Sequence, residues 1–566
     1  MKDKKIEFWK VCLVLASVVV TFSGLFDHQV WTPDEPRVAA IIHNMYMTGN
    51  FIIPSYANIS FVEKPPLFFI ISTLVMHITP LDAVMSGRLA LALLCLGTLF
   101  VTFKLVKRLK DTQSAWIAFA ILATSEGFIL NFHWLRVDAS LIFFVTAAIW
   151  AFAEAYFANK TRWLYWAGLF TGLAFLSKGP VAIVLIFPAW VYLLARYCYL
   201  RKQDQEVFPT NSKVVAHHVI GIAIMVITIA CWVYPFYLTA SPQLWYEWFW
   251  QNQVGRFTGT AAAALGHVIK GRPFYYLNGL TEYTLPWTVF FFGWFVLLVK
   301  RYLKEKSISW YDGFLLVWFA TVIFVFSYSE TKRSMYLAPL MPLLAMISTQ
   351  AISQLKGNWV NRYRQGWALL MSVFLVLIAT TPLWYQLLPM KKIPERTITW
   401  LAEWHWTAAL IFVFVALMWV VETTKWKSWV KMSVITALFF SAGITHLFPG
   451  IDVTKDMRTD LNKFARQVPV EQRSKIAGIN FTETMSSIIY LFENWPVHMV
   501  KKNQAVAILQ GKDPVYDSLL VDCYNTELGP VQCASLDYKG KIKILAEGHP
   551  RSNKSQDTLY WIKGVQ

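Results

Sequence analysis

Charged residues are scarce in this sequence of 566 residues. Only 15% of the residues are Asp, Glu, Lys or Arg, whereas 56% are apolar; soluble domains have about 25% charged residues. The chain contains 41 Phe, 27 Trp and 24 Tyr, which is too many for soluble cores with so few charges to cover them. Disordered, fibrous and disulfide-scaffold classes are therefore excluded, and the composition predicts a polytopic α-helical membrane protein.

Sequence features of metal-binding and ATP-driven proteins are also missing. The six cysteines form no CxxC pair, so they supply no metal-binding framework. No G-x-x-x-x-G-K-[ST] motif is present, which argues against ATP-driven transport by this chain. The formal charge of +18 reflects in part the basic cytoplasmic loops of a membrane protein, so it does not indicate nucleic-acid binding.

Apolar segments recur along residues 1–447. A membrane-crossing helix needs about 20 mostly apolar residues, and a run of about 10–14 is too short. This criterion predicts thirteen spans and places the short, proline-bounded segment 66–79 at the membrane interface. The predicted spans cover residues 9–29, 84–103, 113–130, 139–157, 163–177, 180–195, 215–238, 283–299, 311–327, 335–354, 367–387, 405–421 and 430–447.

The distribution of Lys and Arg among the loops predicts the orientation. The segment before the first span and the loop 104–110 belong to a basic set of loops, which is typical of the cytoplasmic side. With thirteen spans, the N-terminus is expected in the cytoplasm, and the loops 30–83 and 239–282 on the opposite, periplasmic face. The tail 448–566 is expected there as a soluble α/β or α+β domain, in which Cys523 and Cys533 either stay thiols or form a disulfide.

Acidic and basic residues gather in the loops of the predicted periplasmic face. Asp34 is expected at the N-cap of a helix, with Arg37 on the same face, and taken alone this pattern is best explained by capping and a surface ion pair. Arg136, two residues before Asp138, is interpreted as a helix-end cation. Carboxylates and cations together nevertheless indicate a site for phosphate and a divalent metal. The face carries Asp34, Glu63, Asp138, Arg37, Lys64, Lys178, Arg256 and Lys332.

The motifs on this face resemble those of one family of membrane enzymes. They are WTPDEPR (31–37), FVEKPP (61–66), LSKGP (176–180), QNQVGRF (251–257), GH (266–267), PFYY (273–276), and Lys332 with Tyr336. In this order they are similar to the bacterial lipid A 4-amino-4-deoxy-L-arabinose transferases, which are GT-C glycosyltransferases of the protein O-mannosyltransferase-like group. The resemblance covers the whole chain. It implies a GT-C catalytic domain (1–447) with about thirteen transmembrane helices and a C-terminal periplasmic α/β domain (448–566).

The resemblance implies a sugar-transfer reaction at the bacterial inner membrane. An amino sugar, 4-amino-4-deoxy-L-arabinose, would leave undecaprenyl phosphate and join a phosphate of lipid A with inversion at the anomeric carbon. Asp34 corresponds to the main catalytic carboxylate, and Asp138 to the second acidic position. The residues expected to bind the carrier phosphate or substrate are Lys64, Arg256, Lys178, Arg37, Lys332, Tyr336, Tyr275 and Tyr276.

The resemblance also implies a divalent metal ion, zinc, held by Glu63 and His267. Two protein ligands alone make an open site, which phosphate oxygens or water would complete. The metal and the cations would stabilise the negative charge that develops on the departing phosphate. Because a lipid A phosphate is already ionised near neutral pH, proton abstraction contributes little. Asp34 is therefore expected to orient the acceptor or to stabilise oxocarbenium-like charge on the sugar.

Two other functions remain open from the sequence. The nearer one is a GT-C transferase that uses another polyprenyl-phosphate sugar, a hexosamine or hexose, or a protein or glycan acceptor. The remote one is a lipid transporter or flippase, but the chain shows no two-fold internal similarity of the kind that many transporters have. The basic surface favours an anionic acceptor.

Overall fold

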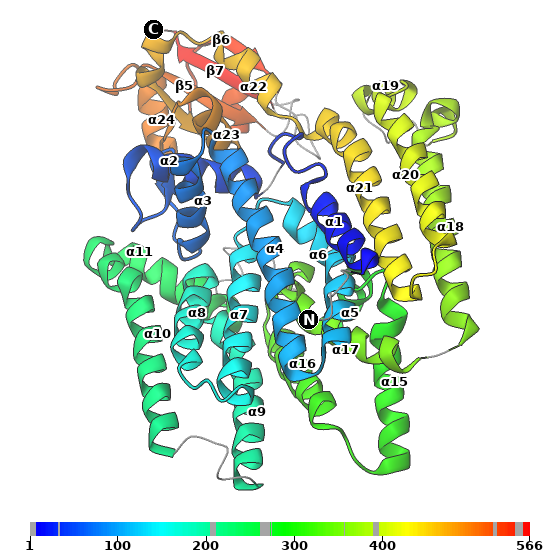
Figure 1. The fold of residues 1–566 in the computed structure, drawn as a ribbon. Coiled ribbons are helices and arrows are strands. Elements are labelled where there is room, and N and C mark those ends of the chain that lie inside the picture. Colours follow the sequence, from blue (N-terminus) through cyan, green and yellow to red (C-terminus); the bar gives the residue numbers. More distant parts are fainter. Residues whose placement is uncertain are drawn as a thin grey trace.

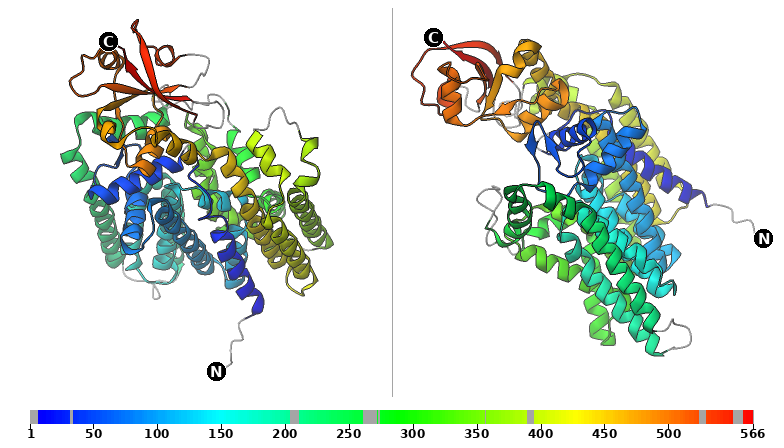
Figure 2. Two further views of the ribbon diagram at one scale, coloured as in Figure 1. Left: turned by 90° about the horizontal axis from the view of Figure 1, so that it is seen from above. Right: turned by 90° about the vertical axis from the view of Figure 1, so that its left-hand side faces the viewer.

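The computed structural model describes residues 7–31, 34–203, 211–260, 272, 274–355, 357–388, 395–523, 529–549 and 558–565. Most of these residues lie in helices that run side by side in a bundle. The last part of the chain forms a small domain with a β-sheet at one end of this bundle (Figures 1 and 2).

Each of the thirteen apolar segments predicted as a span coincides with helix. The helices are α1 (Phe8–Phe22), α4 (Ala83–Leu109), α5 (Thr112–Ala123) followed by α6 (Glu126–His133), α7 (Asp138–Phe157), α8 (Trp163–Lys178), α9 (Val181–Gln203), α10 (Asn211–Thr239), α15 (Thr288–Glu305), α16 (Trp310–Tyr328), the 3-10 helix η2 (Ser334–Leu340) followed by α17 (Met341–Gln354), α18 (Asn358–Ala379), α20 (Trp406–Thr423) and α21 (Ser428–Lys455). Within the described residues, eight helices are long and apolar enough to cross a membrane, or up to ten if each of two bent pairs is one span.

The outer helices of the bundle show where lipid contacts the protein. Of the most apolar stretch of 18 residues in α10, only 11% is buried inside the protein, and for α20 the buried share is 22%. Val215, Ile222 and Ile227 of α10 are more than half exposed, an arrangement that is stable in hydrocarbon but not in water. The chain is therefore a multi-pass membrane protein.

The two bent helix pairs meet at their breaks. The chain turns by 56° between α5 and α6, and by 117° between α14 (Tyr275–Tyr283) and α15. The backbone N–H of Glu126 donates to the carbonyl of Leu285 at 2.9 Å, and the indole of Trp287 donates to Thr124 Oγ1 at 3.1 Å. Polar groups freed at a break inside a membrane protein must find hydrogen-bond partners within the protein. Here groups at each break are hydrogen-bonded to groups at the other.

Several helix ends differ from the predicted ones, and two of the differences bear on the loops of the site and on the domain boundary. The first span was expected to reach residue 29, but α1 ends at Phe22, because Gly24 takes φ +68° and a Cβ there would lie 2.2 Å from Ile444. The last span was expected to end at 447, whereas α21 continues through Pro449 to Lys455. The predicted domain boundary at 447/448 thus falls inside α21.

The first long loop folds into a small layer on the bundle. Helix α2 (Glu35–Thr48) ends at Gly49 in the left-handed conformation. A hairpin of β1 (Ser55–Tyr56) and β2 (Ile59–Ser60) then leads to α3 (Leu67–Ile78), the short helix expected for 66–79. In the second long loop and beyond, the further elements are α11 (Pro242–Tyr246), the π-helix η1 (Glu247–Gly255), α12 (Arg256–Thr258), η3 (Thr381–Leu383), η4 (Tyr385–Leu387) and α19 (Glu395–Ala402).

The C-terminal domain is built on a mixed five-stranded sheet in the order β4-β3-β5-β7-β6. Strands β4, β3 and β5 are parallel, and β5, β7 and β6 pair antiparallel. The domain contains α22 (Arg458–Ala465), η6 (Val470–Lys475), β3 (Ile476–Ile479), α23 (Glu483–Glu493), β4 (His498–Met499), α24 (Lys502–Leu509), β5 (Ser518–Cys523), α25 (Pro530–Cys533), β6 (Ile542–Gly548) and β7 (Thr558–Gly564).

Both faces of this sheet are covered, which explains why β5 is buried along its whole length. Leu520 packs with the residues of α22 and α23 on one face, whereas Leu519 and Val521 pack with those of α24 on the other. Alternate residues of a strand point to opposite faces, so the continuous apolar run is the expected pattern for a doubly covered sheet. The prediction of a C-terminal α/β domain is confirmed.

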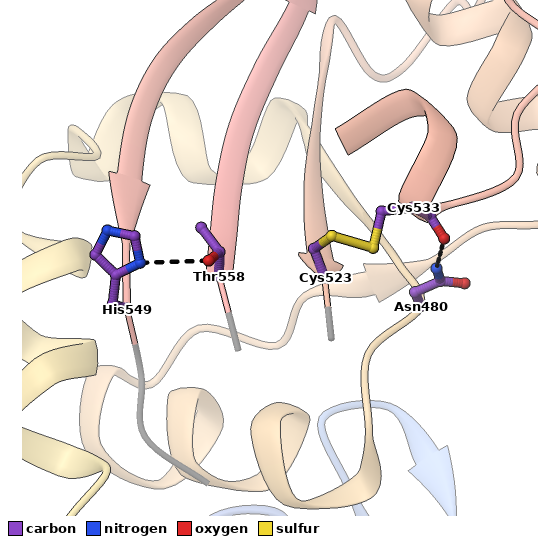
Figure 3. Close-up of a disulfide and its surroundings, with 5 residues drawn as sticks. All are labelled: Asn480, Cys523, Cys533, His549 and Thr558. Atoms are coloured by element: carbon purple, nitrogen blue, oxygen red, sulfur yellow. Dashed lines mark hydrogen bonds between the residues drawn. A yellow bond between two sulfur atoms is a disulfide. The ribbon is translucent and has the colours of Figure 1, made fainter. Parts of the chain in front are cut away.

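Cys523 and Cys533 form a disulfide in this domain (Figure 3). The bond ties the end of β5 to the end of α25, and the side-chain amide of Asn480 donates to the carbonyl of Cys533 at 3.2 Å. The pair is separated by ten residues, and of the two possibilities left open by the sequence the structure has the bridge.

We expect the Cys523→Ser/Cys533→Ser double variant to lose about 2–3 kcal/mol of stability in the C-terminal domain, because the closed loop restricts the unfolded chain. Pulse proteolysis in urea would measure this loss by the appearance of fragments cleaved after residue 455. Cys12→Ser is the matched control, since Cys12 has no disulfide partner. Equal protease resistance of the double variant and the control would contradict the prediction.

Candidate active site

The charged loops predicted for one face do lie together, at the end of the bundle that carries the C-terminal domain (Figure 1). They are the start of α2, the segment between β2 and α3, the start of α7, the end of α8 and the segment from η1 to α12. A π-helix such as η1 is rare and frequently marks a functional site.

Asp34 lies between two arginines. It is the N-cap residue of α2, and its Oδ1 is 3.4 Å from Arg37 Nη2, one turn later. Its Oδ2 is 3.6 Å from Arg136 Nε. The guanidinium of Arg136 lies over the ring of Trp134, 4.9 Å from its centroid. Arg136 lies at a helix end, two residues before α7, as the sequence predicts, and its side chain pairs with Asp34, a partner that the sequence did not indicate.

Glu63 is surrounded by cations. Its carboxylate oxygens lie 2.7 Å from Arg256 Nη2, 3.7 Å from Lys64 Nζ and 3.9 Å from Arg37 Nη1. Burial raises the pKa of Glu63, but Lys64, Arg256 and Arg37 together outweigh burial and lower this pKa to about 2. Glu63 is therefore a carboxylate at any physiological pH, and it holds three cations in one place.

Asp138 is the first residue of α7 and is buried. Its Oδ1 accepts from the ammonium of Lys178, which ends α8 and lies 5.0 Å from the centroid of the Tyr336 ring. Its buried Oδ2 makes no hydrogen bond within the described part of the chain. A buried acceptor without a partner is costly, so this oxygen is available to a substrate hydroxyl, an amine or water.

A cavity of about 360 Å³ opens beside these residues. The side chains of Glu63, Lys64, Lys178 and Arg256 line one part of it, and apolar side chains of α9 and α16 such as Val184 and Phe326 line another. The cavity is thus lined by both cationic and apolar side chains, a combination that suits a lipid with a phosphate head group.

A second, much smaller pocket adjoins the first. It is lined by Asp34, Arg37, Arg136 and Asp138, and Lys64 lines both pockets. Lys64 therefore stands at the junction between the carboxylates and the larger cavity.

A buried network beneath the site fixes its loops. Glu35 accepts from the backbone N–H of Trp31 at 2.7 Å and from that of Leu135 at 2.8 Å. Arg88 of α4 lies 3.4 Å from the same carboxylate and donates to the carbonyl of His28 at 2.6 Å. This role was not predicted from the sequence. The only signal was that Glu35 and Arg88 are charged residues next to or within apolar segments.

The Trp31 side of this network also reaches the last helix of the bundle. The indole of Trp31 donates to Asp452 of α21 at 2.6 Å, and both carboxylate oxygens of Asp452 accept from the backbone N–H of Gln29 at 3.0 Å. The loop before α2 is therefore held from two directions, by α4 and by α21.

Two of the predicted binding residues, Lys332 and Tyr275, line neither pocket. Lys332 is buried, and its ammonium donates to the carbonyl of Ser329 at 2.6 Å. Tyr275 packs edge-on against Tyr276 at 5.2 Å between ring centroids. Tyr276 lines the larger cavity, as does Tyr336. The structure therefore brings together nine of the expected residues. They are Asp34, Arg37, Glu63, Lys64, Asp138, Lys178, Arg256, Tyr276 and Tyr336.

The described residues do not by themselves form a metal site. Among them there is no group of three or more His, Cys, Asp or Glu side chains placed to hold a metal ion. The carboxylate of Glu63, one of the two predicted ligands, lies within 3.9 Å of three cations. His267, the other predicted ligand, lies outside the described residues.

The chain is similar in sequence to several known proteins. The family model of dolichyl-phosphate-mannose-protein mannosyltransferases matches residues 63–234. An "Undecaprenyl phosphate-alpha-4-amino-4-deoxy-L-arabinose arabinosyl transferase" of Shewanella sediminis is 26% identical, over 87% of this chain and 85% of that protein. An uncharacterized protein of Aquifex aeolicus is 28% identical over 61% of this chain and 64% of that protein. A Proteus mirabilis protein named for the same transferase activity is 27% identical over 62% and 61%, so the chain spans less than two thirds of these last two relatives.

A solved structure shows the same fold. The crystal structure of ArnT from Cupriavidus metallidurans bound to undecaprenyl phosphate superposes with a TM-score of 0.73 and covers 99% of both chains, at 16% sequence identity. The apo structure of that protein gives a TM-score of 0.72. The predicted GT-C fold is confirmed.

We expect Glu35→Gln to destabilise the protein and to abolish its activity, because a neutral amide leaves Arg88 buried without an ion-pair partner. Removing one partner of a buried pair costs about 3–5 kcal/mol. The melting temperature of the purified protein in detergent would show the loss. Glu7→Gln is the control, because Glu7 pairs with Lys10 at the surface. A Glu35→Gln protein with an unchanged melting temperature would rule out the network as a structural support.

Proposed function

Because the chain has the GT-C fold and is related in sequence to the lipid A aminoarabinose transferases, we propose that it is a glycosyltransferase of that kind. It moves an amino sugar, 4-amino-4-deoxy-L-arabinose, from undecaprenyl phosphate to a phosphate of lipid A with inversion. The observation that carries this proposal is the pair of adjoining pockets that share Lys64, one cationic and apolar and the other lined by two carboxylates and two arginines.

The larger cavity suits the donor. Its apolar wall accommodates part of a polyprenyl chain, while Lys64, Lys178 and Arg256 face the phosphate. When the bond to the sugar breaks, negative charge develops on the carrier phosphate, and cations that are already in place stabilise it without reorganisation. Glu63 and Asp138 hold these cations in position through the ion pairs described above.

The side chains around the smaller pocket, which encloses only about 10 Å³, suit the charged head of the acceptor once they move apart to admit it. A lipid A phosphate is ionised near neutral pH, so it attacks without a strong base, and Arg37 and Arg136 supply forked contacts for its oxygens. Asp34, held between these two arginines, orients the acceptor and stabilises positive charge on the sugar ring. The unpartnered Oδ2 of Asp138 is available to a hydroxyl or the amine of the sugar.

The proposed orientation places this chemistry outside the cytoplasm of a bacterial cell, in the inner membrane. The basic loops predict a cytoplasmic N-terminus. The site and the C-terminal domain share one end of the bundle (Figure 1), and this end is then periplasmic. A disulfide in the C-terminal domain is consistent with an oxidising compartment.

A zinc ion at Glu63 and His267 remains a proposal that rests on the family resemblance. It would act as a Lewis acid toward phosphate oxygens. Arg256 lies 2.7 Å from one oxygen of the Glu63 carboxylate, so the metal would share this carboxylate with the ion pair.

The proposed transfer predicts a mass change in lipid A. Purified protein in lipid nanodiscs, supplied with undecaprenyl-phosphate aminoarabinose and lipid A, should increase the mass of lipid A by one pentosamine. Asp34→Asn should abolish this product. Lys64→Ala should lower kcat/KM about 10- to 150-fold, the effect of losing one charge-assisted phosphate contact, while Lys304→Ala, at the far end of α15, should leave it unchanged. Mass spectrometry of the product decides.

Each negative result of that assay has a distinct meaning. A hexosamine or hexose increment, with the matching donors supplied, would replace the sugar in the proposal. No product on lipid A but product on a protein or glycan would replace the acceptor. Full activity of Asp34→Asn would remove Asp34 from the catalytic residues.

The metal proposal predicts bound zinc in the purified protein and less of it in the His267→Ala variant. Elemental analysis after gel filtration measures this independently of activity. His217→Ala is a control, because His217 is not a predicted metal ligand and its Nδ1 forms a hydrogen bond with Thr161 Oγ1 at 2.7 Å. Equal zinc in all three proteins, or none in any, would reject His267 as a ligand.

A further inference from the structure

The C-terminal domain reaches into the site through one helix. Helix α23 lies along α2 (Figure 1), and two contacts seven residues apart on each helix join them. Glu483 at the start of α23 pairs with Arg37. The hydroxyl of Tyr490, two turns later, donates to Asn44 at 2.6 Å, and its ring meets that of His43 at 5.6 Å.

The two partners of the first contact differ in burial. The side chain of Arg37 is 12% exposed, and that of Glu483 is 63% exposed. Arg37 also stays near Asp34 and Glu63 and packs on the ring of Phe61, 4.9 Å away. Arg37 is therefore fixed, whereas Glu483 can swing into solvent.

The charge of the site leaves room for an anion. Without Glu483, the two pockets hold more cations than carboxylates. The cations are Arg37, Lys64, Arg136, Lys178 and Arg256, and the carboxylates are Asp34, Glu63 and Asp138. Glu483 is the one further acid in contact with these groups among the described residues, and it comes from a different domain.

We propose that Glu483 occupies the position at Arg37 that an acceptor phosphate takes, and that it leaves when such an acceptor binds. This inference rests on the proposed function and adds a determinant of acceptor selection to it. A phosphate displaces the carboxylate because it forms forked, doubly charged contacts with a guanidinium, whereas an ion pair with an exposed partner contributes little. A neutral hydroxyl acceptor gains nothing comparable and does not displace Glu483.

The displacement requires no separation of the domains. The Tyr490 contact and the packing of Ile488 and Ile489 within the domain hold α23 while the Glu483 side chain rotates. Glu483 is thus a specificity-determining side chain on a fixed helix.

The test compares two acceptors and three variants. Binding of lipid A with both phosphates, and of lipid A dephosphorylated enzymatically, is measured by surface plasmon resonance on the full protein in nanodiscs. Glu483→Gln should bind the phosphorylated lipid about 2- to 5-fold more tightly, because the competing charge is gone. Its affinity for the dephosphorylated lipid should not change.

Two controls separate charge from docking. Tyr490→Phe removes a neutral contact of α23 and should affect both lipids alike. Glu471→Gln removes an exposed charge elsewhere in the domain and should affect neither. An equal change for both lipids in Glu483→Gln, or weaker binding of the phosphorylated lipid, would overturn the proposal.

The transfer assay distinguishes this inference from the proposed function. If transfer occurs, the acceptor KM of Glu483→Gln should fall by the same factor with kcat unchanged. If the protein transfers no sugar to lipid A but Glu483→Gln still binds the phosphorylated lipid more tightly, the reaction is wrong and the role of Glu483 stands. If the protein transfers the sugar to lipid A but Glu483→Gln has no charge-dependent effect on acceptor binding, the proposed reaction stands and the proposed role of Glu483 is wrong.

Discussion

The site depends on one buried carboxylate, that of Glu35. Its two oxygens accept from the backbone N–H groups of Trp31, four residues before it, and of Leu135, a hundred residues after it. Asp34 follows Trp31 by three residues, and Asp138 follows Leu135 by three residues. Because both amides belong to the main chain and donate to one buried side chain, these hydrogen bonds fix the spacing of the two loops, and such support holds a reaction site in its working geometry.

Above this support the charges alternate. Each carboxylate of the site contacts at least one cation, and Glu63 contacts three. Five cations in one water-poor chamber would repel each other strongly if no acid separated them. The acids therefore let the protein keep its cations in place before any phosphate arrives, while the remaining positive excess is left for the substrates.

The fold and most of the site could be predicted from the sequence because both leave local signals. Apolar length marks the spans, and short motifs of polar residues mark the loops, so the grouping of Lys64, Asp138 and Arg256 was foreseen. Residues that act through distant partners left no such signal. Arg136 was predicted only as a helix-end cation, and Glu483 lies in an ordinary amphipathic helix. The packing of α23 on α2 is what brings Glu483 to Arg37.

The proposed inversion explains why the two pockets must meet at a cation. Inversion places the attacking and the leaving oxygen on opposite faces of the anomeric carbon, so both phosphates cannot share one pocket. As the reaction proceeds, negative charge increases on the leaving phosphate and decreases on the attacking phosphate. A cation within reach of both stabilises the transition state more than either ground state, and Lys64, which lines both pockets, stands where that charge is redistributed.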